Sequence, residues 1–320
     1  MHKREAFYAK LLLFGEYSIL LGSSALSIPY GHFNAELSFI REDKYTDVNF
    51  AIRSNQLLKE FREYLIKEWS QANSILNLKQ LSADLNDGLY LESTIPQSYG
   101  LGSSGAVCAA LYARYALNRI QVSGKITSHE IIILREIFSK MESFFHGQSS
   151  GIDPLGIYLR YPLHFNCDSV PSLVGIPRTW KNQASGIFLI DSGQPGKTGP
   201  LVNSFIEKFA PAQEISAIGQ RFCNLTNACI RTLLSGDNQG FWNHLANLSE
   251  FQLNSMQPMI PASLRQYVQS GFENGLFFLK LCGSGGGGFL TGFAPDFPSA
   301  SAWFNNQNIN IIPVYLARTE

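Results

Sequence analysis

The chain has 320 residues, more than a single hydrophobic core usually organises, so we expect two domains. Lysine plus arginine and aspartate plus glutamate number 25 each, and no basic cluster stands out, which argues against nucleic acid as the main partner. The composition, 45% hydrophobic and 16% charged, is that of an ordinary globular protein. Five cysteines without a C-x-x-C pair or a nearby histidine indicate reduced thiols and no zinc site.

The apolar stretch near the N-terminus resembles a signal peptide only superficially, because Lys10 and Glu16 interrupt it. No apolar run is long enough to span a membrane. We therefore expect a cytoplasmic protein without a membrane partner. The same stretch, AKLLLFGEYSILLGSSALSIPYG, predicts two short strands around a turn, and FNAELSFI and DVNFAIR predict further strands.

The middle of the chain alternates helical and extended patterns. Residues 57–76 have the spacing of a helix, and the strand GLYLESTI leads to a glycine-rich loop that is followed by an apolar helix. Thr127 and Glu130 predict a capping box at the start of the next helix, which runs to His146. The strands LRYPLHFN and SGIFLIDSG follow. The proline-rich segment between them predicts a domain boundary, giving domains of residues 1–178 and 179–320.

The remaining sequence predicts mainly helices and then strands. Helices are expected over residues 201–209, 215–234 and 241–256, with strands over 276–283, 289–293 and 309–317. A second glycine-rich loop separates the first two of these strands.

The first glycine-rich loop, Pro96 to Gly105, places small residues where a helix begins. Backbone amides there can reach an anion without obstruction, and the helix dipole adds positive charge, so the loop predicts a phosphate site. It also reads G-x-G-x-x-G. A dinucleotide-binding turn should follow a strand directly, and an acid that binds the ribose should come about 20 residues later. The strand ends before Pro96 and no acid lies between Gly105 and His129, so a phosphate loop of another type, or a purely structural turn, fits better.

The second glycine-rich loop contains four consecutive glycines, Gly285 to Gly288, between two apolar strands. A plain hairpin needs only two turn residues, so these glycines predict close approach of the backbone to something else, with a flexible spacer as the alternative. The segment DSGQPGKT has the Gly-Lys-Thr of a Walker loop. Asp191 replaces its first glycine, however, and Gly199-Pro200 follow where a helix should run. A substrate-contacting or structural turn is the better interpretation.

Two acids, Glu142 and Asp153, flank a helix end and a turn of small residues. A carboxylate on a helix suits Mg²⁺, and an acid on a turn can reach a substrate hydroxyl, although each acid, taken alone, is more often a solvated or capping group. His146 by itself is interpreted as a structural histidine.

Three segments, KLLLFGEYSILLGSSAL, PQSYGLGSSGA and KLCGSGGGGF, resemble in order the three motifs of the GHMP kinases, and the resemblance spans nearly the whole chain. Glu142 followed by HGQSSGID is most similar to mevalonate kinases. Tyr17 stands where those enzymes commonly have histidine, and FGEY is similar to phosphomevalonate kinases. Ser284 stands where the third motif often has alanine.

The resemblance implies a mixed α+β and α/β two-domain GHMP kinase fold, with an N-terminal domain like ribosomal protein S5 domain 2 and a ferredoxin-like C-terminal domain. It implies transfer of the γ-phosphate of ATP to a substrate hydroxyl. The acceptor it favours is mevalonate, which would give 5-phosphomevalonate, a step of isoprenoid precursor synthesis. Phosphomevalonate kinase and a sugar kinase of the same superfamily are alternatives. A catalytically silent sensor that binds a nucleotide or metabolite is the non-enzymatic alternative.

The same resemblance assigns roles to individual residues. Asp153 and Lys10 are expected to be catalytic, Glu142 and Ser104 to hold Mg²⁺, and Glu16, Tyr17 and Thr198 to contact the substrate. ATP is expected to bind two loops, made of Gly100, Leu101, Gly102, Ser103, Ser104 and Gly105 and of Gly283, Ser284, Gly285, Gly286 and Gly287. The expected partner is a small-molecule alcohol, and a homodimer is left open.

Overall fold

The structure is a computed structural model that describes residues 5–40, 47–122, 126–166, 169–177, 184–196, 198–211 and 214–316. The chain divides into two compact units. Unit 1 comprises Met1–Lys10, Pro29–Pro96 and Gly102–Tyr161, and unit 2 comprises Leu11–Ile28, Gln97–Leu101 and Pro162–Glu320. The predicted division at residue 178 falls in a segment, 178–183, outside the described residues, and it stays a prediction.

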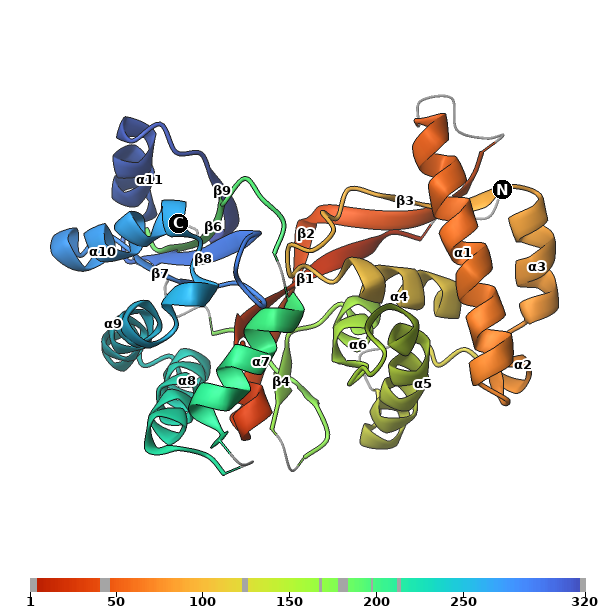
Figure 1. The fold of residues 1–320 in the computed structure, drawn as a ribbon, viewed down its shortest axis with the longest axis horizontal. Helices are drawn as coiled ribbons and strands as arrows, with labels where there is room; N and C mark the ends of the chain where they lie inside the picture. Colours follow the sequence, from red (N-terminus) through yellow and green to blue (C-terminus); the bar gives the residue numbers. More distant parts are fainter. Residues whose placement is uncertain are drawn as a thin grey trace. The chain divides into compact units, whose positions relative to one another are not determined.

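Unit 1 combines helices with parts of β1 and β2 and with β3, against which α1 and α3 pack (Figure 1). Its elements include the N-terminal part of β1, most of β2, β3 and six helices: β1 (Phe7–Phe14), β2 (Ala25–Phe39), α1 (Val48–Glu68), α2 (Ala72–Ile75), α3 (Leu78–Asn86), β3 (Leu89–Ser93), α4 (Ser103–Tyr115), α5 (Ser128–His146) and α6 (Ile152–Leu159). Its core contains an aromatic group in which Tyr112 contacts Phe138 and Tyr158 edge-on. All three side chains are fully buried.

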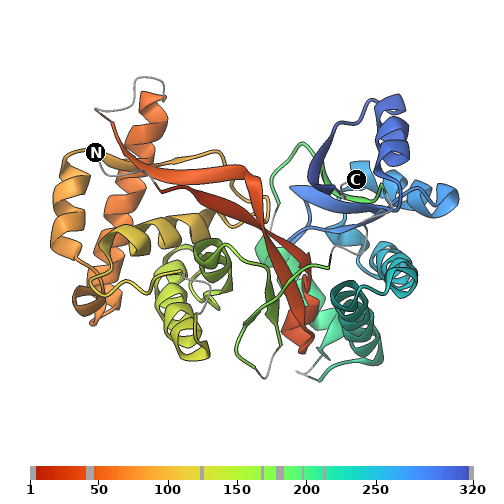
Figure 2. The same cartoon turned by 180° about the vertical axis from the view of Figure 1, so that it is seen from behind.

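Unit 2 combines an antiparallel sheet with helices (Figure 2). Its elements are η1 (Ser18–Leu21), β4 (Leu163–Phe165), β5 (Ser172–Leu173), β6 (Gly186–Asp191), α7 (Thr198–Phe209), α8 (Ala217–Ser235), α9 (Asn238–Ser255), η3 (Gln257–Met259), η4 (Ala262–Leu264), α10 (Arg265–Asn274), β7 (Phe278–Leu281), β8 (Phe289–Ala294), α11 (Phe297–Asn306) and β9 (Ile311–Leu316), together with the remaining parts of β1 and β2. Its core is rich in stacked phenylalanine rings, such as Phe205 on Phe209 and Phe222 on Phe251.

Two sheets organise the strands. One has five strands in the order β1-β2-β4-β5 with β3 also paired to β2, and the other has four in the order β7-β8-β6-β9. In the second sheet, β6 is central, because it pairs antiparallel with both β8 and β9. Its residues from Gly186 to Ile190 are all buried, as expected for a strand covered on both faces.

Most predicted elements are confirmed, and so is the capping box, in which Thr127 Oγ1 accepts from the Glu130 amide and the Glu130 carboxylate accepts from the Thr127 amide. The strand predicted at DVNFAIR is wrong, because this segment is the start of α1. Asp47 accepts a hydrogen bond from the amide of Asn49 and caps this helix. The apolar residues Val48 and Ile52, whose partial alternation suggested a strand, lie exposed one helical turn apart.

The segment FNAELSFI also differs from its prediction, since it continues β2 and forms no separate strand. The helix predicted over residues 57–76 is interrupted, since α1 ends at Glu68 and Ala72–Ile75 form the separate helix α2. The α7 helix begins at Thr198, so a helix does follow the Gly-Lys-Thr sequence. Among the described residues, no helix combines the length and apolar character that crossing a membrane requires.

Candidate functional site

The glycine loop at the start of α4 leaves the first turn of that helix open. Gly102 is the N-cap in the left-handed conformation (φ 80°), and no side chain caps the helix. The first turn contains Ser103, Ser104 and Gly105 and no acid. A helix N-terminus without a capping side chain keeps its amides and partial positive charge available for an anion.

Gly105 brings α4 close to the beginning of α6. A Cβ atom at this position would lie 2.9 Å from the Pro154 nitrogen and 3.1 Å from the Asp153 carbonyl carbon. Gly151, at the N-cap of α6, approaches α5 in the same way, since a Cβ there would lie 2.3 Å from the Arg135 oxygen. Two glycines thus allow α6 to pack closely against both α4 and α5, which are its neighbours in Figure 1.

Lys10 and Asp153 form an ion pair within unit 1. The Lys10 Nζ lies 2.9 Å from Asp153 Oδ1, and the side chain of Lys10 is 7% exposed whereas that of Asp153 is 37% exposed. The stem of Lys10 passes beside Gly102, where a Cβ would lie 3.1 Å from Lys10 Cγ. The pair therefore lies next to the beginning of α4, with the carboxylate partly accessible to a ligand.

Glu142 on α5 is buried and accepts hydrogen bonds from two serines. Ser104 Oγ donates to its Oε1 at 3.0 Å, and Ser149 Oγ donates to its Oε2. Burial, assisted by the negative charge of Asp153, raises the pKa of Glu142 to about 7. The two serine hydrogen bonds and the charge of Lys10 oppose this rise. A cation near this carboxylate would relieve the cost of its burial.

The side chains around Glu142 can supply only part of a metal's coordination shell. This suits Mg²⁺ better than a metal whose ligands all come from the protein. Among the described residues, no group of three or more histidines, cysteines and acids could hold a metal. One carboxylate and the Ser104 hydroxyl are nevertheless suited to Mg²⁺, which usually takes one or two protein carboxylates and completes its shell with phosphates and water.

The loop of residues 283–288, here called the glycine loop of unit 2, packs against other main-chain segments. A Cβ at Gly285 would lie 2.3 Å from the Met259 oxygen, and one at Gly287 would lie 2.3 Å from the Pro195 oxygen. Gly283 and Gly100 approach each other so closely that a Cβ on either would meet the other's Cα within 3.2 Å. The predicted close approach is thus at least in part an approach to the protein's own backbone.

Main-chain hydrogen bonds anchor the second half of this loop. The Gly286 amide donates to the main-chain oxygen of Met259, and the Gly288 amide donates to the main-chain oxygen of Gln194, both at 2.6 Å. These two amides are therefore engaged within the protein. The Gly288 oxygen in turn accepts from the Ser192 amide at 2.9 Å, which joins the loop to the turn that resembled a Walker loop.

Glu16 and Tyr17, expected to contact substrate, make internal contacts. Glu16 Oε1 lies 2.5 Å from Lys280 Nζ, and both side chains are almost fully buried. The Tyr17 hydroxyl donates a hydrogen bond to the main-chain carbonyl oxygen of Ser284 at 2.5 Å, and the Tyr17 ring packs on Phe205. Their expected role at the substrate stays a prediction. Thr198 is the first residue of α7.

The structure brings the predicted residues together in two groups. Lys10, Gly102 to Gly105, Glu142 and Asp153 gather in unit 1, and Glu16, Tyr17, Gly100, Leu101 and the glycine loop gather in unit 2. Sequence reasoning assigned no role to Ser149 or Lys280, although both lie in the motifs HGQSSGID and KLCGSGGGGF. The available signal for Lys280 was a lysine inside an otherwise apolar strand.

His146 contacts the Ser104 hydroxyl with its Nε2 at 3.1 Å, so it adjoins the predicted metal ligands. Its ring is exposed.

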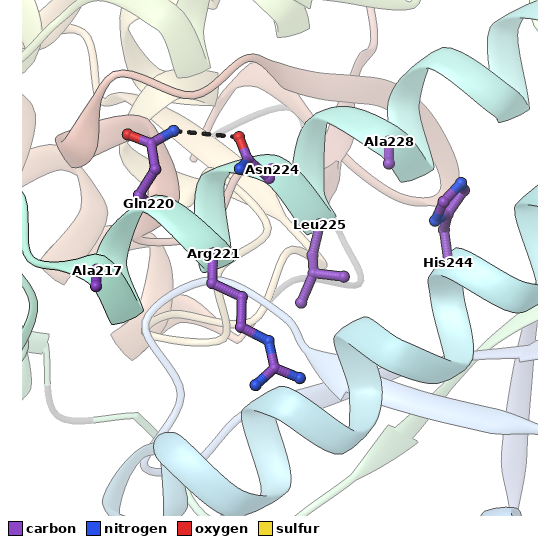
Figure 3. Close-up of a pocket in the computed structure, with 7 residues that line it drawn as sticks. All are labelled: Ala217, Gln220, Arg221, Asn224, Leu225, Ala228 and His244. Carbon is purple, nitrogen blue, oxygen red and sulfur yellow. Dashed lines mark hydrogen bonds between the residues drawn. The ribbon is translucent and has the colours of Figure 1, made fainter.

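A hollow of about 550 Å³ lies elsewhere in unit 2, between α8 and α9 (Figure 3). On α8, the side chain of Gln220 donates a hydrogen bond to that of Asn224, one helical turn later. The hollow is lined by Ala217, Gln220, Arg221, Asn224, Leu225, Ala228 and His244. None of these is a motif residue.

Comparison with protein families identifies the part of the chain that carries the first group apart from Lys10. Residues 57–159 match the model of the GHMP kinases N terminal domain. This segment is a GHMP kinase N-terminal domain. The match includes α4, α5 and α6 with the glycine loop at Gly102, and hence Glu142 and Asp153.

Similarity to known proteins extends beyond the GHMP kinase N-terminal domain. The mevalonate kinase of Thermococcus sibiricus is 26% identical over 313 residues, which cover 92% of this chain and 90% of that protein.

Two solved structures resemble the whole chain. The crystal structure of the Methanococcus jannaschii mevalonate kinase has a TM-score of 0.65 at 18% identity and covers 98% of each chain. Lactococcus lactis galactokinase in complex with galactose has a TM-score of 0.62 at 15% identity and covers 99% of this chain and 95% of its own. The fold is therefore the mixed helix and sheet fold of the GHMP kinases, as predicted.

Proposed function

We propose that the chain is an ATP-dependent kinase that phosphorylates the hydroxyl of mevalonate. The observation that carries this proposal is the Lys10–Asp153 ion pair beside the open first turn of α4. The similarity to the mevalonate kinase of Thermococcus sibiricus supports the acceptor. Fold alone does not select it, because a galactokinase has a similar structure.

Phosphoryl transfer needs positioning and charge stabilisation more than covalent chemistry, so few side chains have to act. Asp153 accepts the proton of the acceptor hydroxyl, or orients that hydroxyl for attack. Because its Oδ1 is engaged by Lys10, the carboxylate is held in one orientation, and Lys10 adds positive charge where negative charge develops. Both residues lie in regular secondary structure, Lys10 on β1 and Asp153 on α6.

The ATP phosphates are assigned to the loop from Gly100 to Gly105 and to the glycine loop of unit 2. The amides at the start of α4 carry the favourable helix charge. Glu142 and Ser104 would hold Mg²⁺, which neutralises phosphate charge when bound. Ser149 keeps the carboxylate of Glu142 oriented through its hydrogen bond to Oε2. Thr198 remains a proposed substrate contact.

The proposal is tested by measuring ADP formation by the purified chain with ATP and, in turn, mevalonate, phosphomevalonate, galactose and homoserine. We expect mevalonate to give the highest kcat/KM, and Asp153→Asn to supply the background rate. Preference for another alcohol would replace the acceptor and leave the kinase assignment intact. Binding of ATP without turnover of any acceptor would favour the sensor alternative.

A further inference from the structure

Tyr17 has an unusual backbone conformation for a residue other than glycine. Its φ is 62° and its ψ is −43°, at the N-cap of η1. Positive φ is costly for a bulky residue and nearly free for glycine, so a tyrosine that keeps this conformation is held there by its side-chain contacts. The structural role of Tyr17 therefore follows from those contacts.

The Tyr17 side chain links η1 to the glycine loop of unit 2. The residue is 6% exposed, its ring centroid lies 4.8 Å from that of Phe205, and its hydroxyl donates to the Ser284 oxygen at 2.5 Å. Burial raises the pKa of Tyr17 to about 12, so the hydroxyl stays protonated and remains a donor throughout the ordinary pH range.

This hydrogen bond fixes the direction of a whole peptide group. The Ser284 carbonyl and the Gly285 amide belong to one planar trans peptide, and in such a group the C=O and N–H point in opposite directions. No cis peptide bond occurs among the described residues. When Tyr17 holds the Ser284 oxygen, the Gly285 N–H is turned to the opposite side.

The neighbouring residue anchors the strand that leads into the same loop. Glu16 pairs with Lys280 on β7, whose Nζ also donates to the Leu281 oxygen at 2.5 Å and lies 5.6 Å from the centre of the Phe14 ring. A buried ion pair of this kind is weak evidence for stability but holds its partners in one geometry. Two consecutive residues thus contact this region. Glu16 pairs with Lys280 on the strand before the loop, and Tyr17 binds Ser284 in the first half of the loop.

The two halves of the loop are held by different means. Main-chain acceptors at Met259 and Gln194 hold the amides of Gly286 and Gly288, as described above. The first half receives a hydrogen bond from a side chain, that of Tyr17. Loss of the Tyr17 hydroxyl therefore removes a hydrogen bond from the first half of the loop, while the main-chain hydrogen bonds of the second half remain.

We infer that Tyr17 is a positioning residue for nucleotide binding: its hydroxyl orients the Ser284–Gly285 peptide so that the Gly285 amide is presented to the phosphates of ATP. The inference rests on the proposed function, since it takes the glycine loop as an ATP loop. It gives Tyr17 a different role from contact with the acceptor.

The test is Tyr17→Phe, which keeps the ring and removes only the hydroxyl. A neutral hydrogen bond contributes modestly, so we expect the Kd of Mg²⁺ with the slowly hydrolysed analogue AMPPNP, measured by calorimetry, to rise about 3–10-fold. The KM for ATP should rise similarly, while the KM for mevalonate and kcat change by less than about twofold. A structural defect alone would not separate the two KM values in this way.

Tyr158→Phe is the matched control, because Tyr158 is also buried and its hydroxyl also donates to a backbone oxygen, that of Ile120, at 2.5 Å. It should lower Tm at least as much as Tyr17→Phe and leave the ATP affinity unchanged. Hydrogen–deuterium exchange supplies a second measurement, in which Tyr17→Phe should speed exchange in peptides covering residues 283–288 and in no peptide of unit 1.

Three results would overturn the inference. Unchanged AMPPNP affinity and unchanged exchange in Tyr17→Phe would remove the positioning role. A higher KM for mevalonate with unchanged ATP affinity would place Tyr17 at the acceptor instead. Failure of the wild-type chain to bind Mg²⁺-AMPPNP would reject the proposed nucleotide site itself, and it is recognised without any variant.

Discussion

Lys10 Nζ and Asp153 Oδ1 lie 2.9 Å apart although the two residues come from opposite ends of unit 1 in sequence, one from β1 and one from the first turn of α6. The carboxylate remains partly exposed while the ammonium group is nearly buried. This asymmetry leaves the acid accessible to an alcohol and keeps the lysine as its fixed partner.

Asp153→Asn should therefore lower kcat by about 10²–10⁴-fold, the usual contribution of general acid–base catalysis, and leave AMPPNP affinity nearly unchanged. Asp87→Asn, at an exposed acid that ends α3, is the matched control and should leave kcat unchanged. Steady-state kinetics and calorimetry check both. Nearly full turnover of Asp153→Asn would exclude Asp153 as the base.

Glu142→Gln should raise the Mg²⁺ concentration needed for half-maximal activity by about tenfold or more, because an amide oxygen is a weaker ligand for Mg²⁺ than a carboxylate oxygen. The substitution keeps the size of the side chain and an acceptor for Ser104 or Ser149. Activity is measured over a magnesium titration at saturating ATP. An unchanged titration curve would remove Glu142 from the metal site.

Gly105→Ala tests whether the close approach of α4 and α6 places Asp153. The new Cβ would lie 2.9 Å from the Pro154 nitrogen, so α6 has to shift, and we expect kcat to fall about 10–100-fold. Gly175→Ala is the control, since a Cβ there meets nothing within 4 Å. Equal kcat values for the two variants would show that α6 tolerates the displacement.

Asp84→Asn addresses the dependence of stability on pH. Burial raises the pKa of Asp84, but hydrogen bonds from Tyr115, Arg114 and Gln80 outweigh burial, and the net pKa is lowered. A lowered folded-state pKa stabilises the protein above the unfolded-state pKa of about 3.9, and this stabilisation is lost as the pH falls through the folded-state value.

We therefore expect Asp84→Asn to lower the free energy of unfolding by about 2 kcal/mol at pH 7, and the difference from wild type to shrink in acid. Urea unfolding at several pH values measures it. Glu63→Gln is the control, because the Arg62–Glu63 pair is at the surface and should contribute less than about 1 kcal/mol. A pH-independent difference at Asp84 would contradict the assignment to its charge.

The acceptor preference gives a further expected outcome. A phosphorylated acceptor needs at least one more cation than a carboxylate alone, because burying an unpaired phosphate is prohibitive. We expect kcat/KM for mevalonate to exceed that for phosphomevalonate at least ~10-fold, or about 1.4 kcal/mol in transition-state binding. Competition between the two substrates in one assay measures the ratio directly, and a reversed ratio would reassign the acceptor.

Local signals in the sequence were sufficient for much of the fold. Turn residues, apolar periodicity and the Thr127–Glu130 capping box are short-range features, and the elements that they predict are present. The start of α1 was missed because the partial alternation of apolar residues in DVNFAIR is compatible with either a strand or a helix. A cap at Asp47 and the long continuation of the helix decided it.

The sequence by itself determined the order of the three motifs, the open N-terminus of α4 and the residue types that suit phosphoryl transfer, because each depends on neighbours along the chain. It could not determine which side chains meet. Only the tertiary structure pairs Asp153 with Lys10, Glu142 with Ser104 and Ser149, and Tyr17 with Ser284. Such contacts arise where helices and loops pack at close range, and that packing depends on main-chain approach at glycines such as Gly105 and Gly285, which sequence spacing does not encode.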